Sequence, residues 1–293
     1  PGSFSMIKLL LVLSIFFSYV LMVAGNVVTT TGSGLDCPDW PLCYGSVTPP
    51  LKLGIWLEWG HRLLGGATGI LILFSTILAW VKSDSKRVKL FTFTALCLLG
   101  IGAAFGGIIV LIEAPLLEGP LHLAVISFHI ILATLIFSIL ILALRSLSST
   151  TSRNMPTFYF HLLGLISLQI VLGIFVKYTE SSLACGTDFP LCQGLLLPNM
   201  DSLEITLHFF HRVIALAILL YITLHLVRSI TTGKDLGNAW TIFTLVIFQG
   251  TVGAFVVWSN MYLPYVVLHG ATGFFILGWT VYKSSPFILK LTA

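Results

Sequence analysis

Residues 7–29 read IKLLLVLSIFFSYVLMVAGNVVT, an apolar run long enough to cross a lipid bilayer as one helix. Similar runs recur along the 293-residue chain, which is 57% hydrophobic, only 9% charged and has a mean hydropathy of +1.01. A membrane barrel would instead alternate apolar and polar residues. The sequence therefore predicts an all-α membrane protein. Residues 1–5, ahead of Met6, are interpreted as a remnant outside the fold.

Polar and Gly/Pro breaks divide the apolar sequence into eight expected transmembrane helices. Eight crossings place both termini on one side of the membrane. The loops and helix ends on that side carry eleven of the fifteen basic residues, and the other side carries nine of the eleven acidic ones. Short cytoplasmic loops accumulate Lys and Arg, so we expect cytoplasmic termini, and the net charge of +4 reflects topology rather than nucleic-acid binding. The expected spans are 7–29, 56–81, 89–112, 120–145, 157–177, 204–228, 236–258 and 262–283.

The loops after the first and fifth expected spans share a sequence pattern. Thr, Ser, Leu and Cys recur at identical spacing in 31–37 and 179–185, and Pro-Leu-Cys follows at 41–43 and 190–192. A His-Arg pair then lies 18 or 19 residues further on, and a Leu-His-x-Ala sequence recurs at 121–124 and 268–271. The repeat predicts two tandem, pseudo-symmetric four-helix bundles, 6–148 and 149–293.

Each half places one histidine near the outer end of its second helix and another near the outer end of its fourth, His61 with His122 and His211 with His269. Neutral imidazoles from facing helices of a bundle are suitable axial ligands for heme iron. A lone intramembrane histidine usually hydrogen-bonds a neighbouring helix. Two pairs in the same register favour heme ligation, because polar residues at membrane depth are costly and usually functional.

Four further side chains are candidates for a place in or near these two sites. His129 lies seven residues after His122, on the same helix face, and either lines the first pocket or packs in the core. His208 lies near the mouth of the second site. Arg62 and Arg212 fit heme propionates, because a guanidinium matches a carboxylate, or they anchor the helix ends at the lipid headgroups.

The two halves differ three residues before the His-Arg pair, where the first half has Glu58 and the second has His208. Glu58 shares a helix face with His61, so a carboxylate is expected beside the first heme, where it could transfer protons. The alternative is a carboxylate solvated at the helix mouth.

Four cysteines lie in the outer loops as two close pairs, Cys37 with Cys43 and Cys185 with Cys192. An extracytoplasmic location permits disulfides, and we interpret both pairs as structural bridges. A redox-active dithiol is the functional alternative.

Together these motifs resemble the heme A synthase family over nearly the whole chain. The resemblance rests on Thr-Gly-Ser-Gly at 31–34, Trp-Pro-Leu-Cys at 40–43, Glu-Trp-Gly-His-Arg at 58–62, Glu-Ser-Ser-Leu-Ala-Cys at 180–185, Pro-Leu-Cys at 190–192, His-Arg at 211–212, and His269. It implies oxidation of the C8 methyl group of heme O to a formyl group. It also implies a heme b cofactor on His211 and His269. His61 and His122 would then flank the substrate heme O, with Glu58 at its reacting edge.

The resemblance also implies a multi-pass protein of the cell membrane with its cysteine loops outside. A heme O synthase, an electron-transfer partner and a homo-oligomer are open partner assignments, and nucleic acid is not expected. Two rival interpretations are a diheme electron carrier similar to cytochrome b proteins, and a membrane thiol-disulfide oxidoreductase. The first does not explain Glu58 opposite His208, and the second predicts no heme.

Overall fold

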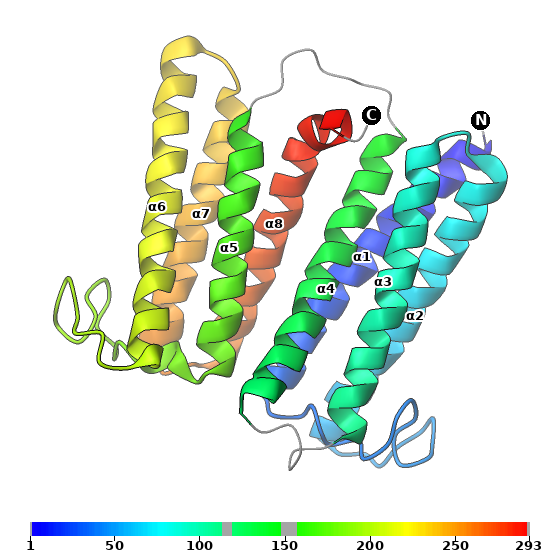
Figure 1. Cartoon of the computed structure of the whole chain (residues 1–293), viewed down its shortest axis with the longest axis horizontal. Coiled ribbons are helices and arrows are strands. Elements are labelled where there is room, and N and C mark those ends of the chain that lie inside the picture. Colours follow the sequence, from blue (N-terminus) through cyan, green and yellow to red (C-terminus); the bar gives the residue numbers. More distant parts are fainter. Residues whose placement is uncertain (1, 113–118, 148–156, 292–293) are drawn as a thin grey trace. The chain divides into compact units, whose positions relative to one another are not determined.

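The structure, a computed structural model, describes residues 2–112, 119–147 and 157–291 (Figure 1). Within these ranges the chain forms eight long α-helices and one short 3-10 helix. Glu113, Glu118 and Arg153, which contributed to the charge pattern, lie outside the described residues. The helices are α1 (Gly2–Thr30), α2 (Leu53–Lys82), α3 (Lys86–Leu111), α4 (Pro120–Ser146), α5 (Thr157–Tyr178), η1 (Ser181–Leu183), α6 (Leu203–Thr232), α7 (Leu236–Trp258) and α8 (Leu263–Leu291).

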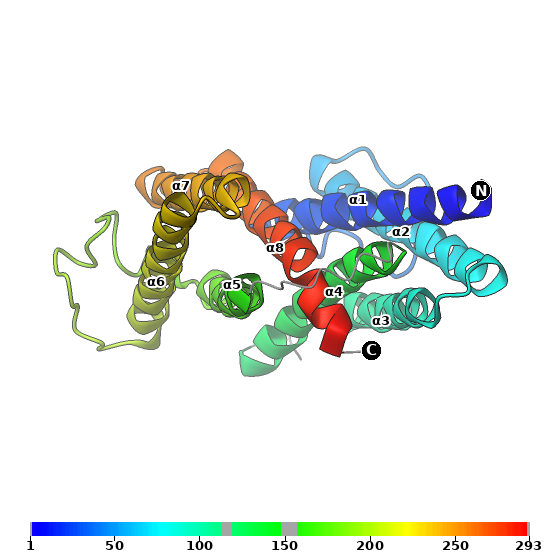
Figure 2. The same ribbon diagram turned by 90° about the horizontal axis from the view of Figure 1, so that it is seen from above.

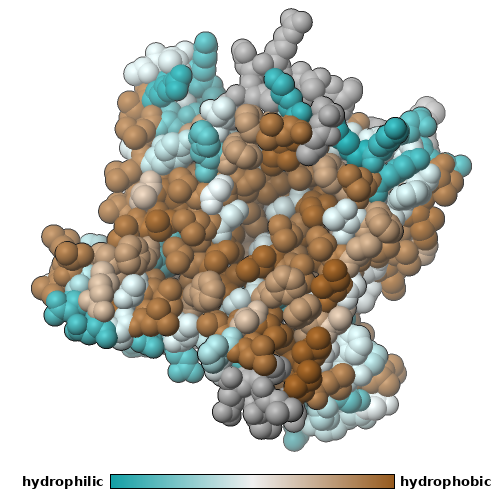
Figure 3. Space-filling view, in the orientation of Figure 1, coloured by the Kyte–Doolittle hydropathy of each residue, from teal (hydrophilic) through white to brown (hydrophobic). Residues whose placement is uncertain are grey.

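All eight α-helices are long and apolar enough to cross a membrane, which confirms the expected all-α membrane fold. Each contains at least 22 residues, against about 20 needed for the hydrocarbon core. Large apolar side chains such as Leu9, Phe74 and Leu224 are exposed on the helix surfaces. Figure 3 shows brown apolar residues over the middle of the helices and teal hydrophilic residues toward their ends. This distribution suits helices surrounded by lipid.

Most helices extend beyond the expected spans, α1 and α8 by the largest margins. α1 begins at Gly2, so residues 2–5, expected to lie outside the fold, are helical. α8 continues to Leu291 and contains Pro286 inside the helix. The hydroxyl groups of Ser284 and Ser285 donate to the carbonyls of Val281 and Tyr282. Proline cannot donate a backbone hydrogen bond, and side-chain hydroxyls of this kind help a membrane helix to continue past it.

The first compact unit contains Pro1–Met155 together with Val281–Ala293. α1 packs against α2 and α4, and α3 packs against the same two helices, so the four helices form a closed ring (Figure 2). Apolar side chains from all four, including Leu11, Ile72, Val88 and Leu140, form its buried core. The end of α8 joins this unit through Arg145, whose Nε donates to Ser285 over 3.0 Å.

The second compact unit contains Pro156–Thr280. α6 packs between α5 and α7. α8 reaches α5 where the rings of Tyr159 and Trp279 meet edge to face at 5.6 Å. The last part of α8 groups with the first unit rather than the second, and the expected division into bundles 6–148 and 149–293 stays a prediction.

Candidate functional site

The two expected disulfides are present, and their structural rather than redox-active role stays a prediction. Cys37 is bonded to Cys43, and Cys185 is bonded to Cys192. All four cysteines are buried. After the second cysteine of each loop the chain turns back through two residues of positive φ, Tyr44-Gly45 and Gln193-Gly194. The two loops therefore share one local structure as well as one sequence pattern.

The two arginines at matching positions of the repeat, Arg62 and Arg212, hold these loops to the helices. Nη1 of Arg62 donates to the carbonyls of Asp39 and Leu42, both over 2.5 Å. Nη1 of Arg212 donates to the carbonyls of Asp188 and Leu191, over 2.7 and 2.5 Å. Both arginines thus contact the loops directly. Their binding to heme propionates stays a prediction.

Glu58 and His208 occupy equivalent places between loop and helix. Glu58 is only 3% exposed; its Oε2 accepts from the backbone N–H of Cys37 over 2.8 Å, and its Oε1 pairs with Arg62. In the second unit, Nδ1 of His208 lies 3.3 Å from the backbone N–H of Cys185 and Nε2 lies 3.2 Å from Nε of Arg212. A carboxylate accepts both hydrogen bonds, but a neutral imidazole accepts only one.

The first histidine of each pair packs against a glycine of the preceding helix. A Cβ atom on Gly25 of α1 would lie 3.0 Å from Cε1 of His61 in α2. A Cβ atom on Gly173 of α5 would lie 3.2 Å from Cε1 of His211 in α6. Each histidine is the ninth residue of its helix, so the two rings lie at the same depth from the loop end. A Cβ atom at either place would crowd the ring, which would have to shift by a few tenths of an ångström.

The second histidine of each pair packs in the same way. A Cβ atom on Gly253 of α7 would lie 3.0 Å from Cε1 of His269 in α8. In the first unit it is His129, with its Cε1 3.5 Å from a Cβ on Gly106 of α3, that makes the matching contact. We name Gly25, Gly106, Gly173 and Gly253 the cradle glycines.

His129 and His122 also lie at different depths along α4. His129 is the tenth residue of α4 and lies close enough to His61 for the two rings to interact electrostatically. His122 is the third residue, so seven residues place it roughly 10 Å nearer the loop end. Nδ1 of His129 also lies 2.9 Å from the carbonyl oxygen of Gly102. These contacts favour His129 as the partner of His61, and His122 stays an untested alternative.

The spacing of His211 and His269 fits a metal-centred cofactor between them. Their ring centroids lie 6.5 Å apart with 65° between the ring planes. An imidazole nitrogen binds a first-row metal at about 2 Å, which with the size of two rings gives an expected separation of roughly 6 Å. The residues present therefore fit axial ligation of a heme.

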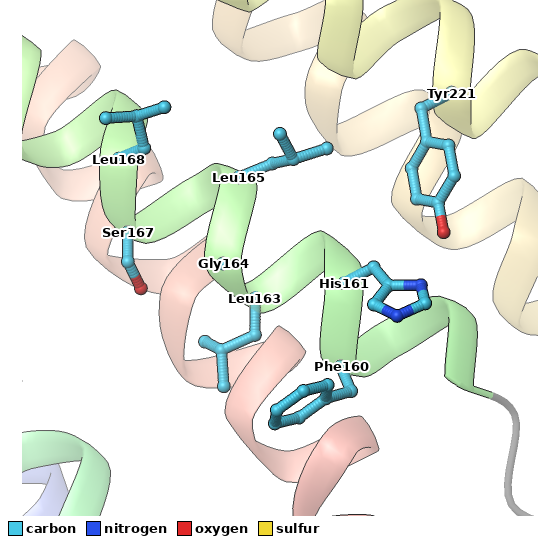
Figure 4. Close-up of a pocket in the computed structure, with 8 residues that line it drawn as sticks. All are labelled: Phe160, His161, Leu163, Gly164, Leu165, Ser167, Leu168 and Tyr221. Atoms are coloured by element: carbon cyan, nitrogen blue, oxygen red, sulfur yellow. The ribbon is translucent and has the colours of Figure 1, made fainter.

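Two grooves open on the described helices. One of about 510 Å³ lies between α1 and α2 and includes His61, Trp56 and Gly60 in its lining. A larger one of about 710 Å³ lies along α5, where Phe160, His161, Leu165 and Tyr221 are among the lining residues (Figure 4). Only the first contains a histidine of the expected sites.

Sequence reasoning missed several residues that shape these sites. Gly25 and Gly173 lie twelve residues before Cys37 and Cys185, so extending the repeat upstream would have found them. Two glutamines, Gln169 and Gln249, contact His211 and His269, and no pattern in the motifs pointed to them.

The described part of the chain defines a multi-pass membrane protein with eight helices that are long and apolar enough to cross a bilayer. The chain belongs to the COX15-CtaA family of cytochrome oxidase assembly proteins, whose family model matches residues 8–54 and 51–281. It is similar to the heme A synthase of Bacillus licheniformis, with 31% identity over 268 residues and 85% of each chain covered. It is also similar to the heme A synthases of Bacillus pumilus, at 30% over 284 residues (90% of this chain, 89% of the relative), and Alkalihalophilus pseudofirmus, at 27% over 262 residues (85% and 86%).

Proposed function

We propose that this protein acts as a heme A synthase, an oxidoreductase that converts the C8 methyl group of heme O to a formyl group. The family and the named relatives support the activity. One observation supports different roles for the two sites, substrate oxidation in the first and cofactor binding in the second. The matching position carries a different side chain in each. The first unit has the carboxylate of Glu58 where the second has the imidazole of His208.

The second-half site is proposed to hold heme b on His211 and His269. The 6.5 Å between their rings and the glycine packed against each ring support this assignment. When bound there, heme b would supply one-electron transfer to and from the protein. Arg212 has a buried Nη2 without a hydrogen-bond partner among the described residues, which leaves a donor for a heme propionate.

The first-half site is proposed to bind the substrate heme O. His61 and His129 are the preferred pair, and His122 is the alternative. The groove between α1 and α2 supports this assignment, because it gives access to His61 from the outer surface of the helices. A hydrophobic substrate dissolved in the bilayer would meet this surface directly.

Glu58 is proposed to hold the substrate or move a proton at its reacting edge. Each carboxylate oxygen already accepts one hydrogen bond, from Cys37 or from Arg62, and each retains a second lone pair. The proposed course is two successive two-electron oxidations of the substrate methyl group, first to an alcohol and then to a geminal diol that loses water. Each replaces a C–H bond by a C–O bond to a water oxygen and releases two protons, and the two electrons would pass to an external electron-transfer partner. Glu58 would accept the protons released at this carbon.

The proposed cellular setting is the cell membrane, with cytoplasmic termini and the disulfide loops outside. The disulfides support an oxidising side for these loops. The lipid bilayer is the surrounding medium. A heme O synthase and an external electron-transfer partner are proposed from the chemistry of the pathway, and a second copy of the chain is a further proposed partner.

The test is to identify the hemes bound to the purified full-length protein, produced in cells that supply heme O. Pyridine hemochrome spectra give the heme content, and chromatography of the extracted pigment separates heme b, heme O, its hydroxylated form and heme A. Heme b together with heme A supports the proposal. Heme b alone, in spite of available heme O, would support the diheme electron carrier instead, and a protein without heme would leave only the thiol oxidoreductase.

A further inference from the structure

The groove between α1 and α2 has small side chains next to His61. Ala24 lies on α1 beside the cradle glycine Gly25, and Gly60 lies on α2 directly before His61. The groove volume of about 510 Å³ lies within the range of about 300–1,000 Å³ that is typical of small-molecule sites. Trp56, which is 38% exposed, lies one turn before Gly60 on the same helix face. The His61 ring therefore borders a groove that is open to the outer surface of the helices.

The sequence repeat pairs each residue that lines this groove with a residue of the second unit. The register that pairs Gly25 with Gly173 relates α1 to α5, and the register that pairs His61 with His211 relates α2 to α6. Much of the lining is alike in size. Leu57, Leu63, Leu64 and Ala67 match Leu207, Val213, Ile214 and Ala217, in that order. Both units thus share the apolar character of this surface.

Three other positions of the lining have larger side chains in the second unit. Ala24, Val27 and Gly60 correspond to Leu172, Phe175 and Phe210, in that order. The difference is reversed at the rim, where Trp56 corresponds to Thr206. Two of the three positions adjoin the residues that pack together, because Ala24 precedes Gly25 and Gly60 precedes His61. The two units therefore differ in the space beside the first histidine of each pair.

Close helix packing does not account for the glycine at position 60. Small residues often serve to bring membrane helices together. A Cβ atom on Gly60, however, would meet nothing within 4 Å among the described residues. In the second unit Phe210 is 46% exposed, and its ring meets that of Phe209 edge to face at 5.8 Å. The place that is open in the first unit thus carries a large aromatic side chain in the second.

We propose that Ala24 and Gly60 form a lateral portal through which heme O enters and leaves the first-half site from the bilayer, and that Leu172 and Phe210 close the matching path in the second half. The two portal residues together carry only one methyl group beside the His61 ring. Heme is flat and mostly apolar, so a path through the lipid-facing surface keeps its macrocycle out of water. Trp56 offers a flat aromatic wall at the rim of this path.

The portal would explain how two similar sites treat their hemes differently. A substrate must exchange, whereas a cofactor must stay, so the inference rests on the proposed function. Gly60 and Ala24 are assigned to the path of the substrate and not to the chemistry. Changes at these residues should therefore alter the rates of heme entry and release without altering how much heme is bound at equilibrium.

Gly60→Phe copies the second half and tests the portal in the full-length protein. Heme O in phospholipid vesicles is supplied to the purified, reconstituted protein, and its uptake and later release to excess apomyoglobin are followed by absorbance. Both rates should be at least about 10-fold slower, the effect of about 1.4 kcal/mol on a barrier. Heme O bound at equilibrium and heme b content should stay unchanged. Gly66→Leu is the matched control, because a Cβ on Gly66 also meets nothing within 4 Å among the described residues and Gly66 is not part of the groove lining.

The reciprocal variant, Phe210→Gly combined with Leu172→Ala, opens the matching path in the second half. Heme b should then pass to apomyoglobin at least about 10-fold faster than from the unmodified protein. Leu216→Gly is the control, because Leu216 corresponds to Gly66 in the repeat and is 56% exposed. If the double variant does not accumulate, Phe210→Ala decides, with Leu216→Ala as its control.

Two results with Gly60→Phe would overturn the inference. Uptake as fast as in Gly66→Leu would leave the groove to lipid chains. Less heme O at equilibrium with unchanged release would make the groove part of the binding site rather than a path to it. Unchanged heme b release from the opened second half would also overturn it. That last measurement needs no heme O, so an unmodified protein that binds no heme O counts against the proposed function, and heme b release still decides the portal.

Discussion

The carboxylate of Glu58 accepts a 2.8 Å hydrogen bond from the backbone N–H of Cys37, and this contact ties a disulfide loop to a helix that carries a heme-ligand candidate. Glu58 also pairs with Arg62, which in turn holds two loop carbonyls. The sequence offered two interpretations of Glu58, proton transfer beside the first heme or solvation at the helix mouth, and the structure shows that this buried side chain supports the loop. Variants of Glu58 need controls that separate these two roles.

Glu58→His copies the second half, where His208 contacts the loop and the arginine at the same place. We expect this variant to fold and to retain heme b, but to form heme A at least about 100-fold more slowly, because an imidazole replaces the carboxylate. Extraction and chromatography of the bound hemes measure both effects. Heme A at the level of the unmodified protein would show that the carboxylate has no catalytic role.

His208→Glu is the reciprocal change in the second unit. A carboxylate can accept from both Cys185 N–H and Arg212, whereas the neutral imidazole accepts from only one of them. We expect the free energy of unfolding to rise by about 1 kcal/mol as the second donor is satisfied. Thermal unfolding in detergent checks this, and a lower midpoint than that of the unmodified protein would contradict the equivalence of the two sites.

His129→Ala and His122→Ala test which histidine of α4 serves the first site. The packing of His129 against Gly106 and its closeness to His61 predict that His129→Ala loses substrate heme while retaining heme b. His122→Ala should keep both hemes. The heme O and heme b contents of each purified variant give the result, and the opposite pattern would restore His122 as the ligand.

Gly173→Ala and Gly253→Ala should each lose most of the bound heme b. The added methyl group would lie 3.2 or 3.0 Å from Cε1 of His211 or His269 and displace the ring. Gly164→Ala on α5 and Gly250→Ala on α7 are matched controls, because a Cβ there meets nothing within 4 Å. Heme b per protein is the measurement. Equal heme b content in the cradle variants and their controls would show that heme binding does not depend on glycine beside His211 and His269.

Replacing Cys185 and Cys192 together with serine should lower the free energy of unfolding by about 2 kcal/mol, since the disulfide no longer restricts the unfolded chain. Cys97→Ser is the control, because Cys97 is a free, exposed cysteine of α3. Thermal unfolding with and without reductant compares the two. If the double variant were as stable as the control, the bridge would have no structural role.

The sequence alone determined the class of fold and supplied the candidate site residues. Long apolar runs commit a chain to membrane helices because unsatisfied backbone groups are not tolerated in lipid, so composition decides where the helices lie. The repeated cysteine and His-Arg motifs located His61, His211 and both loops by spacing alone. The continuation of α8 past Pro286 and the helical residues 2–5 are the largest departures from the expected spans.

The tertiary structure decided which groups meet. Spacing within one helix cannot distinguish His122 from His129, because residues seven apart share a face and differ only in depth. Depth is set by where α4 begins and by what α3 presents to it, here Gly102 and Gly106. The glutamines beside His211 and His269 come from other helices, so their contacts depend on packing between helices that no local pattern in the chain records.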